Sequence, residues 1–156
     1  MDLTLSALTA ADAGELLTIR RAAYVSEAQR LKDPYIPELT QSLEEIVADL
    51  ETDGVVTIGA RATGRLVGSI RVAIDATRAT ISHLAVVPDR RSEGIGQQLL
   101  LAILDYLPPT VGEVAIQTGR DALAAADLVG QSGSIGSLAR AYLARIQPAL
   151  DARGQR

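Results

Sequence analysis

The sequence predicts a single α/β domain in which helices flank a mixed, mostly antiparallel sheet. Residues 55–87 contain three successive strand-like segments separated by short turns, which is typical of antiparallel strands. Residues 79–118 follow the order strand, helix, strand, an arrangement that joins parallel strands. A length of 156 residues leaves no room for two full cores, so we expect one domain over residues 1–156.

The N-terminal third predicts one strand followed by two helices. Residues 2–7 alternate apolar and polar side chains, as a half-buried strand does. Thr9 is a suitable N-cap for a helix that reaches about Arg30, after which two prolines interrupt the chain. Ser42 and Glu45 form a capping box, and apolar residues then recur at helical spacing.

The middle of the chain predicts four strands and one helix. Residues 55–61 and 65–74 are joined by Ala-Thr-Gly, a hairpin signal, and residues 79–87 follow as a third strand. An apolar helix is expected over residues 97–107, where two prolines stop it. Residues 113–118 predict a fifth strand when the strand at the N-terminus is included.

The C-terminal tail predicts helices in place of further strands. Residues 121 to about 131 are rich in alanine, a strong helix former. Over residues 135–152 apolar side chains recur every four positions, which fits a helix strained near Pro148. This apolar stripe needs cover, either from the fifth strand or from a second subunit, which would make a homodimer.

Composition excludes several classes of function. The absence of cysteine excludes disulfides, thiolate metal sites and a cysteine nucleophile, and one histidine argues against a metal site. Without Phe or Trp, a base-stacking platform for nucleic acid is not expected. No apolar run is long enough to span a membrane, and the acidic start does not resemble a signal peptide. We therefore expect a soluble cytoplasmic domain with no nucleic-acid or membrane partner.

The net charge of −4 is divided unevenly along the chain. Residues 1–54 carry 11 acidic and four basic residues, whereas residues 55–156 carry eight acidic and 11 basic residues. The basic part could suit an anionic ligand and the acidic part a cationic one, although ordinary surface charge for solubility explains the pattern as well.

The segment from Arg91 to Gly96 has the form Arg-x-x-Gly-x-Gly and lies between a strand and a helix. The first turn of a helix exposes unpaired N–H groups, and glycines let a phosphate approach them. Arg91 adds a positive charge beside these groups. The segment lacks the Gly-Lys-Ser/Thr of a P-loop, and Leu99 stands where a dinucleotide fingerprint has its third glycine.

Residues 84–100, LAVVPDRRSEGIGQQLL, resemble the acetyl-CoA-binding motif of the GNAT N-acetyltransferase superfamily. Its usual form is a strand ending in Leu-Ala-Val, a proline, Arg/Gln-x-x-Gly-x-Gly/Ala and an apolar helix. The expected elements over residues 1–118 agree with that family, whereas residues 119–156 diverge from it. The resemblance implies a GNAT-like fold and a single acyl-CoA N-acyltransferase-like domain.

The resemblance also implies where acetyl-CoA, the co-substrate, would bind without a metal. N–H groups of the glycine loop would hold the pyrophosphate, and the preceding strand would pair with the pantetheine amides. Residues 24–39 would form a wall of the acceptor pocket. The residues implied in acetyl-CoA binding are Leu84, Ala85, Val86, Arg91, Ser92, Glu93, Gly94, Ile95 and Gly96.

His83 is the candidate catalytic base, because a neutral imidazole can accept a proton near physiological pH. Strand alternation places Ser82 and Leu84 on one face and His83 on the other. If the active face is that of Ser82, a water held by Ser82 is the alternative proton route, and His83 is then a structural or surface residue.

Tyr24 and Glu27 are candidate substrate-binding residues. They lie three positions apart and share a face of the first helix, so they could hold a cationic amine. A solvated helix face explains the same pair equally simply.

The predicted function is transfer of acetyl from acetyl-CoA to the amine of a small molecule or peptide, by direct attack in a ternary complex. Without cysteine, a cysteine thioester intermediate is impossible. GNAT proteins often carry an Asn after the fifth strand and a Tyr four residues later that protonates the departing thiolate, but Ala125 and Val129 stand here. The alternative is a non-catalytic acyl-CoA-binding or regulatory module with the GNAT fold.

Overall fold

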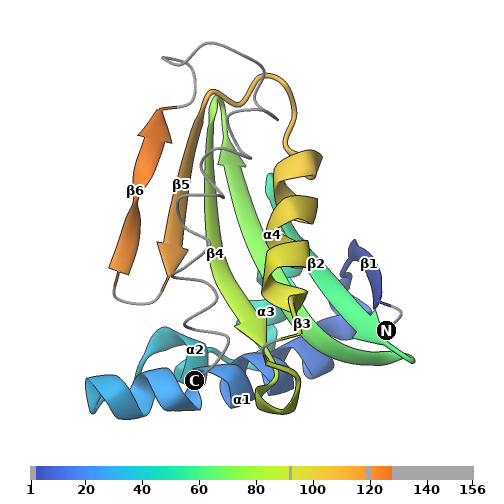
Figure 1. Ribbon diagram of the computed structural model, residues 1–156, viewed down its shortest axis with the longest axis vertical. Helices are drawn as coiled ribbons and strands as arrows, with labels where there is room; N and C mark the ends of the chain where they lie inside the picture. The colour runs from blue at the N-terminus through green and yellow to red at the C-terminus, as the bar shows by residue number, and fades with distance from the viewer. Residues whose placement is uncertain (1–2, 92, 119–120, 128–156) are drawn as a thin grey trace.

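The structure, a computed structural model, describes residues 3–91, 93–118 and 121–127. Within these residues one six-stranded sheet carries helices on both faces (Figure 1). The first elements are β1 (Leu3–Ala7), α1 (Ala13–Leu31), α2 (Pro37–Thr40), α3 (Leu43–Leu50) and β2 (Val55–Ala62). They are followed by β3 (Arg65–Asp75), β4 (Arg78–Val86), α4 (Ile95–Tyr106), β5 (Glu113–Thr118) and β6 (Asp121–Asp127). Short 3-10 turns, η1 (Ala10–Asp12) and η2 (Pro88–Arg90), precede α1 and α4.

The strands are ordered in the sheet as they are in the chain, from β1 to β6. Neighbouring strands are antiparallel except β4 and β5, which are parallel and are connected by α4. The expected hairpin between β2 and β3 is present, with Thr63 and Gly64 both at positive φ, as a tight hairpin turn requires. The predicted mixed, mostly antiparallel sheet flanked by helices is confirmed.

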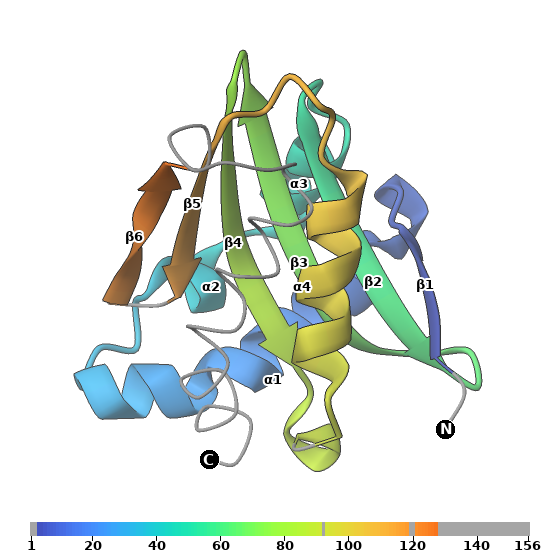
Figure 2. The same cartoon turned by 45° about the horizontal axis from the view of Figure 1, so that its top comes forward.

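The helices divide between the two faces of the sheet. Figures 1 and 2 show α4 in front of the sheet and α3 behind it, and α1 contacts β3 and β4 from the same side as α3. A Cβ added at Gly68 of β3 would lie 2.9 Å from Leu99 Cδ1 of α4, so this glycine allows the close approach of α4 to the sheet. The core between α4 and the sheet is apolar, with the fully buried side chains Ile70, Val72, Ile81, Leu99, Leu100 and Ile103.

The helix expected from Asp121 is wrong, because Asp121–Asp127 forms β6. Alanine favours a helix in isolation. Here the segment pairs with β5 from Glu113↔Asp127 to Thr118↔Asp121, which satisfies backbone groups along the outer edge of β5. This pairing overrides the local propensity. The helix expected over residues 135–152, and with it the expected dimer contact, lies outside the described residues.

The remaining helices begin and end close to the positions that their caps predict. Ser42 Oγ accepts a hydrogen bond from the Glu45 backbone N–H at 3.1 Å, which completes the expected capping box of α3. The first helix is preceded by η1, and α4 begins at Ile95, two residues before its expected start. None of the described helices has both the length and the apolar character needed to cross a membrane.

Candidate functional site

The carboxyl half of β4 has left its neighbour β5. Their register begins at Arg78↔Glu113 and ends at Ile81↔Ile116, although both strands continue. Figure 1 shows the two strands diverging toward their carboxyl ends. Among the described residues, the second half of β4 therefore has no strand partner on the side of β5 and presents an open edge there.

The backbone of this open edge is oriented by the pairing on its other side. Val87 N–H donates to Val67 O of β3 at 2.9 Å. Successive N–H groups of a regular strand alternate between its two edges, so that of Val86 points to the open edge. The edge can therefore pair with an extended ligand.

A β-bulge interrupts β4 at the point where its pairing with β5 ends. Two residues of β4, His83 and Leu84, oppose the single residue Ile70 of β3. His83 has φ of +54°, a left-handed conformation that is rare for its residue type. The bulge turns the imidazole toward Ser82, and Nδ1 lies 3.1 Å from Ser82 Oγ. The expectation that these two side chains lie on opposite faces is wrong, because alternation holds only in a regular strand.

Ser82 links His83 through hydrogen bonds to an ion pair on the face of the sheet that α3 covers. Arg71, the cross-strand partner of Ser82 on β3, donates from Nη1 to Ser82 Oγ at 3.4 Å. Arg71 Nε and Nη2 donate to the two carboxylate oxygens of Asp49 on α3, each at 2.8 Å. Burial alone would raise the pKa of Asp49, but the hydrogen bonds and charge of Arg71, together with the charge of Arg20, hold it below its ordinary value.

The surroundings of His83 keep it neutral. Burial, followed by the charges of Arg20 and Arg71, lowers the pKa of His83 from its ordinary value of 6.5 to about 4. At neutral pH the imidazole can therefore donate a hydrogen bond from one nitrogen and accept one at the other. It holds a proton too weakly to be an effective base there, since a good general base has a pKa near the working pH.

Arg20 is a functional candidate that the sequence analysis missed. It is 1% exposed on the buried face of α1, and its Nη1 donates to Gln41 Oε1 at 3.4 Å. Its Nε and Nη2 have no hydrogen-bond partner among the described residues. Burial lowers the pKa of Arg20, while the charge of Asp49 opposes that effect. Its spacing in the sequence could have revealed it. Arg20 lies four residues after Leu16 and therefore on the apolar, buried face of the helix.

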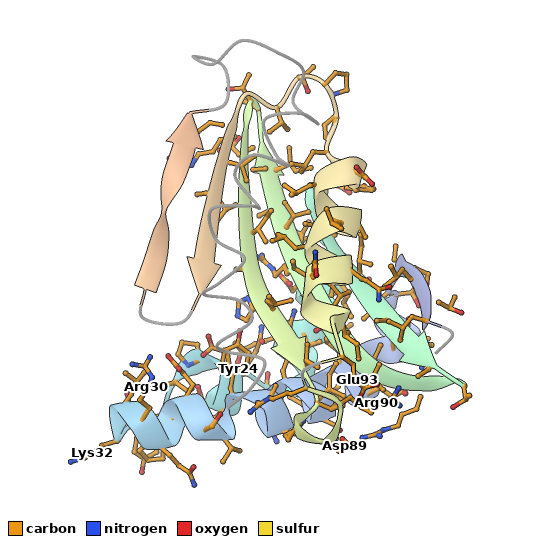
Figure 3. All side chains as sticks on the ribbon, in the orientation of Figure 1. Tyr24, Arg30, Lys32, Asp89, Arg90 and Glu93 are labelled. Atoms are coloured by element: carbon orange, nitrogen blue, oxygen red, sulfur yellow. The ribbon has the colours of Figure 1, made fainter. Side chains whose placement is uncertain are left out.

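The two predicted substrate-binding residues occupy different environments. Tyr24 is buried, and its hydroxyl donates to the Leu84 carbonyl at 3.1 Å, which places it against the bulge. Glu27 pairs with Arg30 at 2.6 Å along the surface of α1. Figure 3 shows Tyr24 near the carboxyl end of β4, and Arg30 and Lys32 toward the far end of α1. Tyr24 therefore lies beside the open edge, and a substrate-binding role for either residue stays a prediction.

The glycine loop exposes backbone N–H groups at the start of α4. Gly94, with φ of +78°, is the N-cap, and the first helical hydrogen bond runs from Gln98 N to Gly94 O at 3.1 Å. The N–H groups of Ile95, Gly96 and Gln97 consequently lack partners within the helix. A Cβ added at Gly96 would meet only the side chains of Leu84 and Val86, at 3.8 Å or more. The loop thus lies directly beside the open edge.

The other predicted loop residues contribute in different ways. Arg91 Nη2 donates to Ala23 O of α1 at 2.8 Å, so it ties the loop to the first helix. Glu93 forms an ion pair with Arg90 at 2.7 Å. The side chain of Ile95 is buried in the core, so this residue can contribute only its backbone N–H to a ligand. Ser92 lies outside the described residues. In the part of the chain that the structure describes, no three acidic or histidine side chains gather as a metal site would need.

Comparison with known proteins now identifies the family. The sequence model of the acetyltransferase (GNAT) family matches residues 16–130. The chain belongs to this family. The match contains most of α1, the open edge of β4 and the glycine loop, so the GNAT resemblance drawn from residues 84–100 is confirmed.

Solved GNAT structures share the fold. One is a PaiA N-acetyltransferase from Thermoplasma acidophilum in complex with coenzyme A, with a TM-score of 0.68 and 21% identity over 83% of this chain and 84% of that chain. Another is a GNAT family acetyltransferase from Brucella melitensis in complex with acetyl-CoA, with a TM-score of 0.60 and 19% identity over 76% of this chain and 79% of that chain. Identities this low establish the fold alone.

A curated relative is the UPF0157 protein YqkA of Bacillus subtilis, which is 29% identical over 121 residues. The aligned part covers 78% of this chain and 34% of YqkA, so this chain spans about a third of the length of that relative.

Proposed function

We propose that this GNAT protein is an N-acetyltransferase that transfers acetyl from acetyl-CoA to an amine by direct attack in a ternary complex. The observation that carries the proposal is the open edge of β4, which leads into the N–H groups at the start of α4. An extended pantetheine arm can add to a strand edge as a further strand would, through Leu84 and Val86. A pyrophosphate suits the N–H groups of Ile95 and Gly96 at a helix N-terminus. The residues present therefore fit acetyl-CoA.

Acetyl-CoA supplies the thioester, and the chain orients it. Backbone N–H groups of the bulged edge would hold the pantetheine arm and polarise the thioester carbonyl. The acceptor amine would approach from the side of α1, where Tyr24 touches the Leu84 carbonyl. As the C–N bond forms, the thioester C–S bond breaks, and the CoA thiolate would take a proton from solvent. His83 would give the acceptor a hydrogen-bonding neighbour, and its low pKa favours solvent as the group that takes the amine proton near neutral pH. A role for His83 as the base stays a prediction.

Thiol release from acetyl-CoA over a panel of primary amines tests the activity. The loop is tested by Gly96→Val, with Gly14→Ala as control because nothing lies within 4 Å of a Cβ added at Gly14. Gly96→Val should weaken acetyl-CoA binding at least about tenfold, because its side chain blocks backbone approach by the phosphates. Arg91→Ala should have a smaller effect, since the N–H groups remain. Unchanged affinity in a folded Gly96→Val protein would remove the loop from the site.

A non-catalytic acyl-CoA-binding or regulatory module is the second candidate. It is favoured by a gap-free reading from Gly119, which puts Ala125 and Val129 at the positions where many GNAT proteins carry Asn and the thiolate-protonating Tyr. Acetyl-CoA binding without thiol release across the amine panel would support this candidate. Thiol release that depends on an amine would exclude it.

A further inference from the structure

Arg20 is a buried charge that, among the described residues, has fewer hydrogen-bond partners than its burial requires. Two of its three guanidinium nitrogens, Nε and Nη2, make no hydrogen bond within the described residues, although the side chain is 1% exposed. Burying an ionised group without hydrogen bonds is strongly unfavourable, so buried arginines are normally paired. The unpaired nitrogens therefore indicate a group that binds there.

The neighbours of Arg20 leave this need unmet. Asp49 and Glu38 act on Arg20 through their charge, but among the described residues neither accepts a hydrogen bond from Nε or Nη2, and both oxygens of Asp49 accept from Arg71. Gln41 contributes one neutral contact at 3.4 Å to the third nitrogen. The pair of cations Arg20 and Arg71 thus faces a single hydrogen-bonded carboxylate.

The geometry of the unpaired nitrogens selects the partner. Nε and Nη2 form the side of a guanidinium from which two parallel N–H groups project, and this side matches the two oxygens of a carboxylate. Arg71 uses the same two nitrogens to hold Asp49. Arg20 on α1 therefore has the same pair of N–H groups, which has no partner among the described residues.

The position of Arg20 relates this fork to the reacting groups. Tyr24 lies one helical turn further along α1, about 5.4 Å in rise, and its hydroxyl contacts the Leu84 carbonyl at the bulge. The charge of Arg20 also lowers the pKa of His83, which is one of the two residues of that bulge. A group bound at Arg20 would consequently be part of a molecule that reaches the open edge of β4.

We propose that Arg20 binds a carboxylate carried by one of the two reacting molecules. This inference rests on the proposed acetyltransferase function and narrows its substrates. The carboxylate belongs either to the amine acceptor, as in an amino acid, or to the acyl group of the donor, as in a dicarboxylic acyl-CoA. Because Arg20 is closed off from solvent, the chain around Gln41 must shift when the carboxylate binds.

Matched ligand pairs distinguish the two sources. In one arm, calorimetry on the CoA-loaded protein compares amino acids with their carboxamides, and thiol release compares them as acceptors. In the other arm, succinyl-CoA is compared with acetyl-CoA. The carboxylate member of one arm should bind at least about 30-fold more tightly, as expected for hydrogen bonds to a charged partner.

Arg20→Met is the decisive variant, because it keeps a long side chain and removes the charge. It should reduce the carboxylate preference to less than about threefold. Arg21→Met is the matched control, since Arg21 is exposed and also contacts Gln41, through a 3.2 Å hydrogen bond to its carbonyl, and it should keep the preference. Arg20→Met should leave the melting temperature of the unliganded protein unchanged or higher, because it removes an unpaired buried charge.

Three results separate the possibilities. Equal binding of both members in both arms would overturn the carboxylate site, as would a large loss of stability in Arg20→Met, which would assign Arg20 to structure. A carboxylate preference in binding with no thiol release from any acyl-CoA would keep the site and overturn the proposed activity.

Discussion

The two faces of one sheet differ in polar content: both are packed by apolar side chains, such as Leu16 and Ile46 on the side of α1 and α3, but among the described residues only one is crossed by a largely buried polar row. Toward α4 the sheet presents apolar residues such as Ile70 and Val72, which pack on a helix of the same character. Toward α1 and α3 a polar row crosses three strands at one register level, from Thr57 through Arg71 to Ser82. Successive residues of β3 serve opposite faces, so a single strand contributes to both. If the polar row serves the proposed binding of a carboxylate, mutations on the α4 face should change mainly stability, whereas mutations near the polar row should change ligand preference as well.

The largest effect on stability should come from the α4 face. Leu99 is fully buried against the sheet, and Leu99→Ala removes that packing and leaves a cavity. We expect a loss of about 3 to 4 kcal/mol in the free energy of unfolding, measured by chemical denaturation. The carboxylate preference attributed to Arg20 should survive under conditions where the variant is folded. A loss below about 1 kcal/mol would show that this face is not the stabilising one.

The next effect concerns His83 and pH. Its pKa falls from 6.5 to about 4 on folding, so the unfolded chain takes up a proton that the folded protein refuses. The contribution of neutral His83 to the free energy of unfolding is fully present above pH 6.5. It is lost as the pH falls through 4, which lowers the free energy of unfolding by roughly 3 kcal/mol in total. His83→Asn, which suits a positive φ, should remove this part of the pH dependence. The check is the difference between the two proteins in unfolding free energy across pH 4 to 7, and parallel curves would contradict the buried, neutral histidine.

The ion pair of the polar face should have a moderate effect. Asp49→Asn removes the charge that Arg71 and Arg20 share, and we expect a loss of about 2 kcal/mol because both partners are largely buried. Asp12→Asn is a suitable comparison, since the pair of Asp12 with Arg61 is similarly short but Arg61 has a second partner in Glu15. Equal losses of unfolding free energy in the two variants would mean that the Asp49–Arg71 pair stabilises the fold no more than the Asp12–Arg61 pair does.

The smallest effect should come from a polar pair outside the row. Glu27 and Arg30 form a short ion pair along α1, with the Arg30 side chain 43% exposed. Glu27→Gln should change the unfolding free energy by less than about 0.5 kcal/mol, and acceptor turnover should stay within about twofold. A much larger loss of turnover would restore Glu27 as a substrate-binding residue.

Sequence patterns predicted the parts of the molecule in which local rules and tertiary structure agree. The hairpin at Thr63 and Gly64, the strands it joins, and the glycine loop before α4 all follow from local turn and helix chemistry. The failures arise where distant segments decide the outcome. The alanine-rich strand β6 exists because β5 offers an edge, and the face of His83 is set by a bulge in the register with β3. Arg20 is buried because α1 packs against the sheet and against α2 and α3.

The central claim is that acetyl-CoA binds along the open edge of β4 and the start of α4. Titration of isotopically labelled protein with acetyl-CoA, followed through backbone amide resonances, tests this most directly. The amides of Leu84, Val86 and Gly96 should shift and saturate together, while those of Thr63 and Gly64 in the β2–β3 turn stay unchanged. Saturating shifts that leave Leu84, Val86 and Gly96 unaffected would contradict the account.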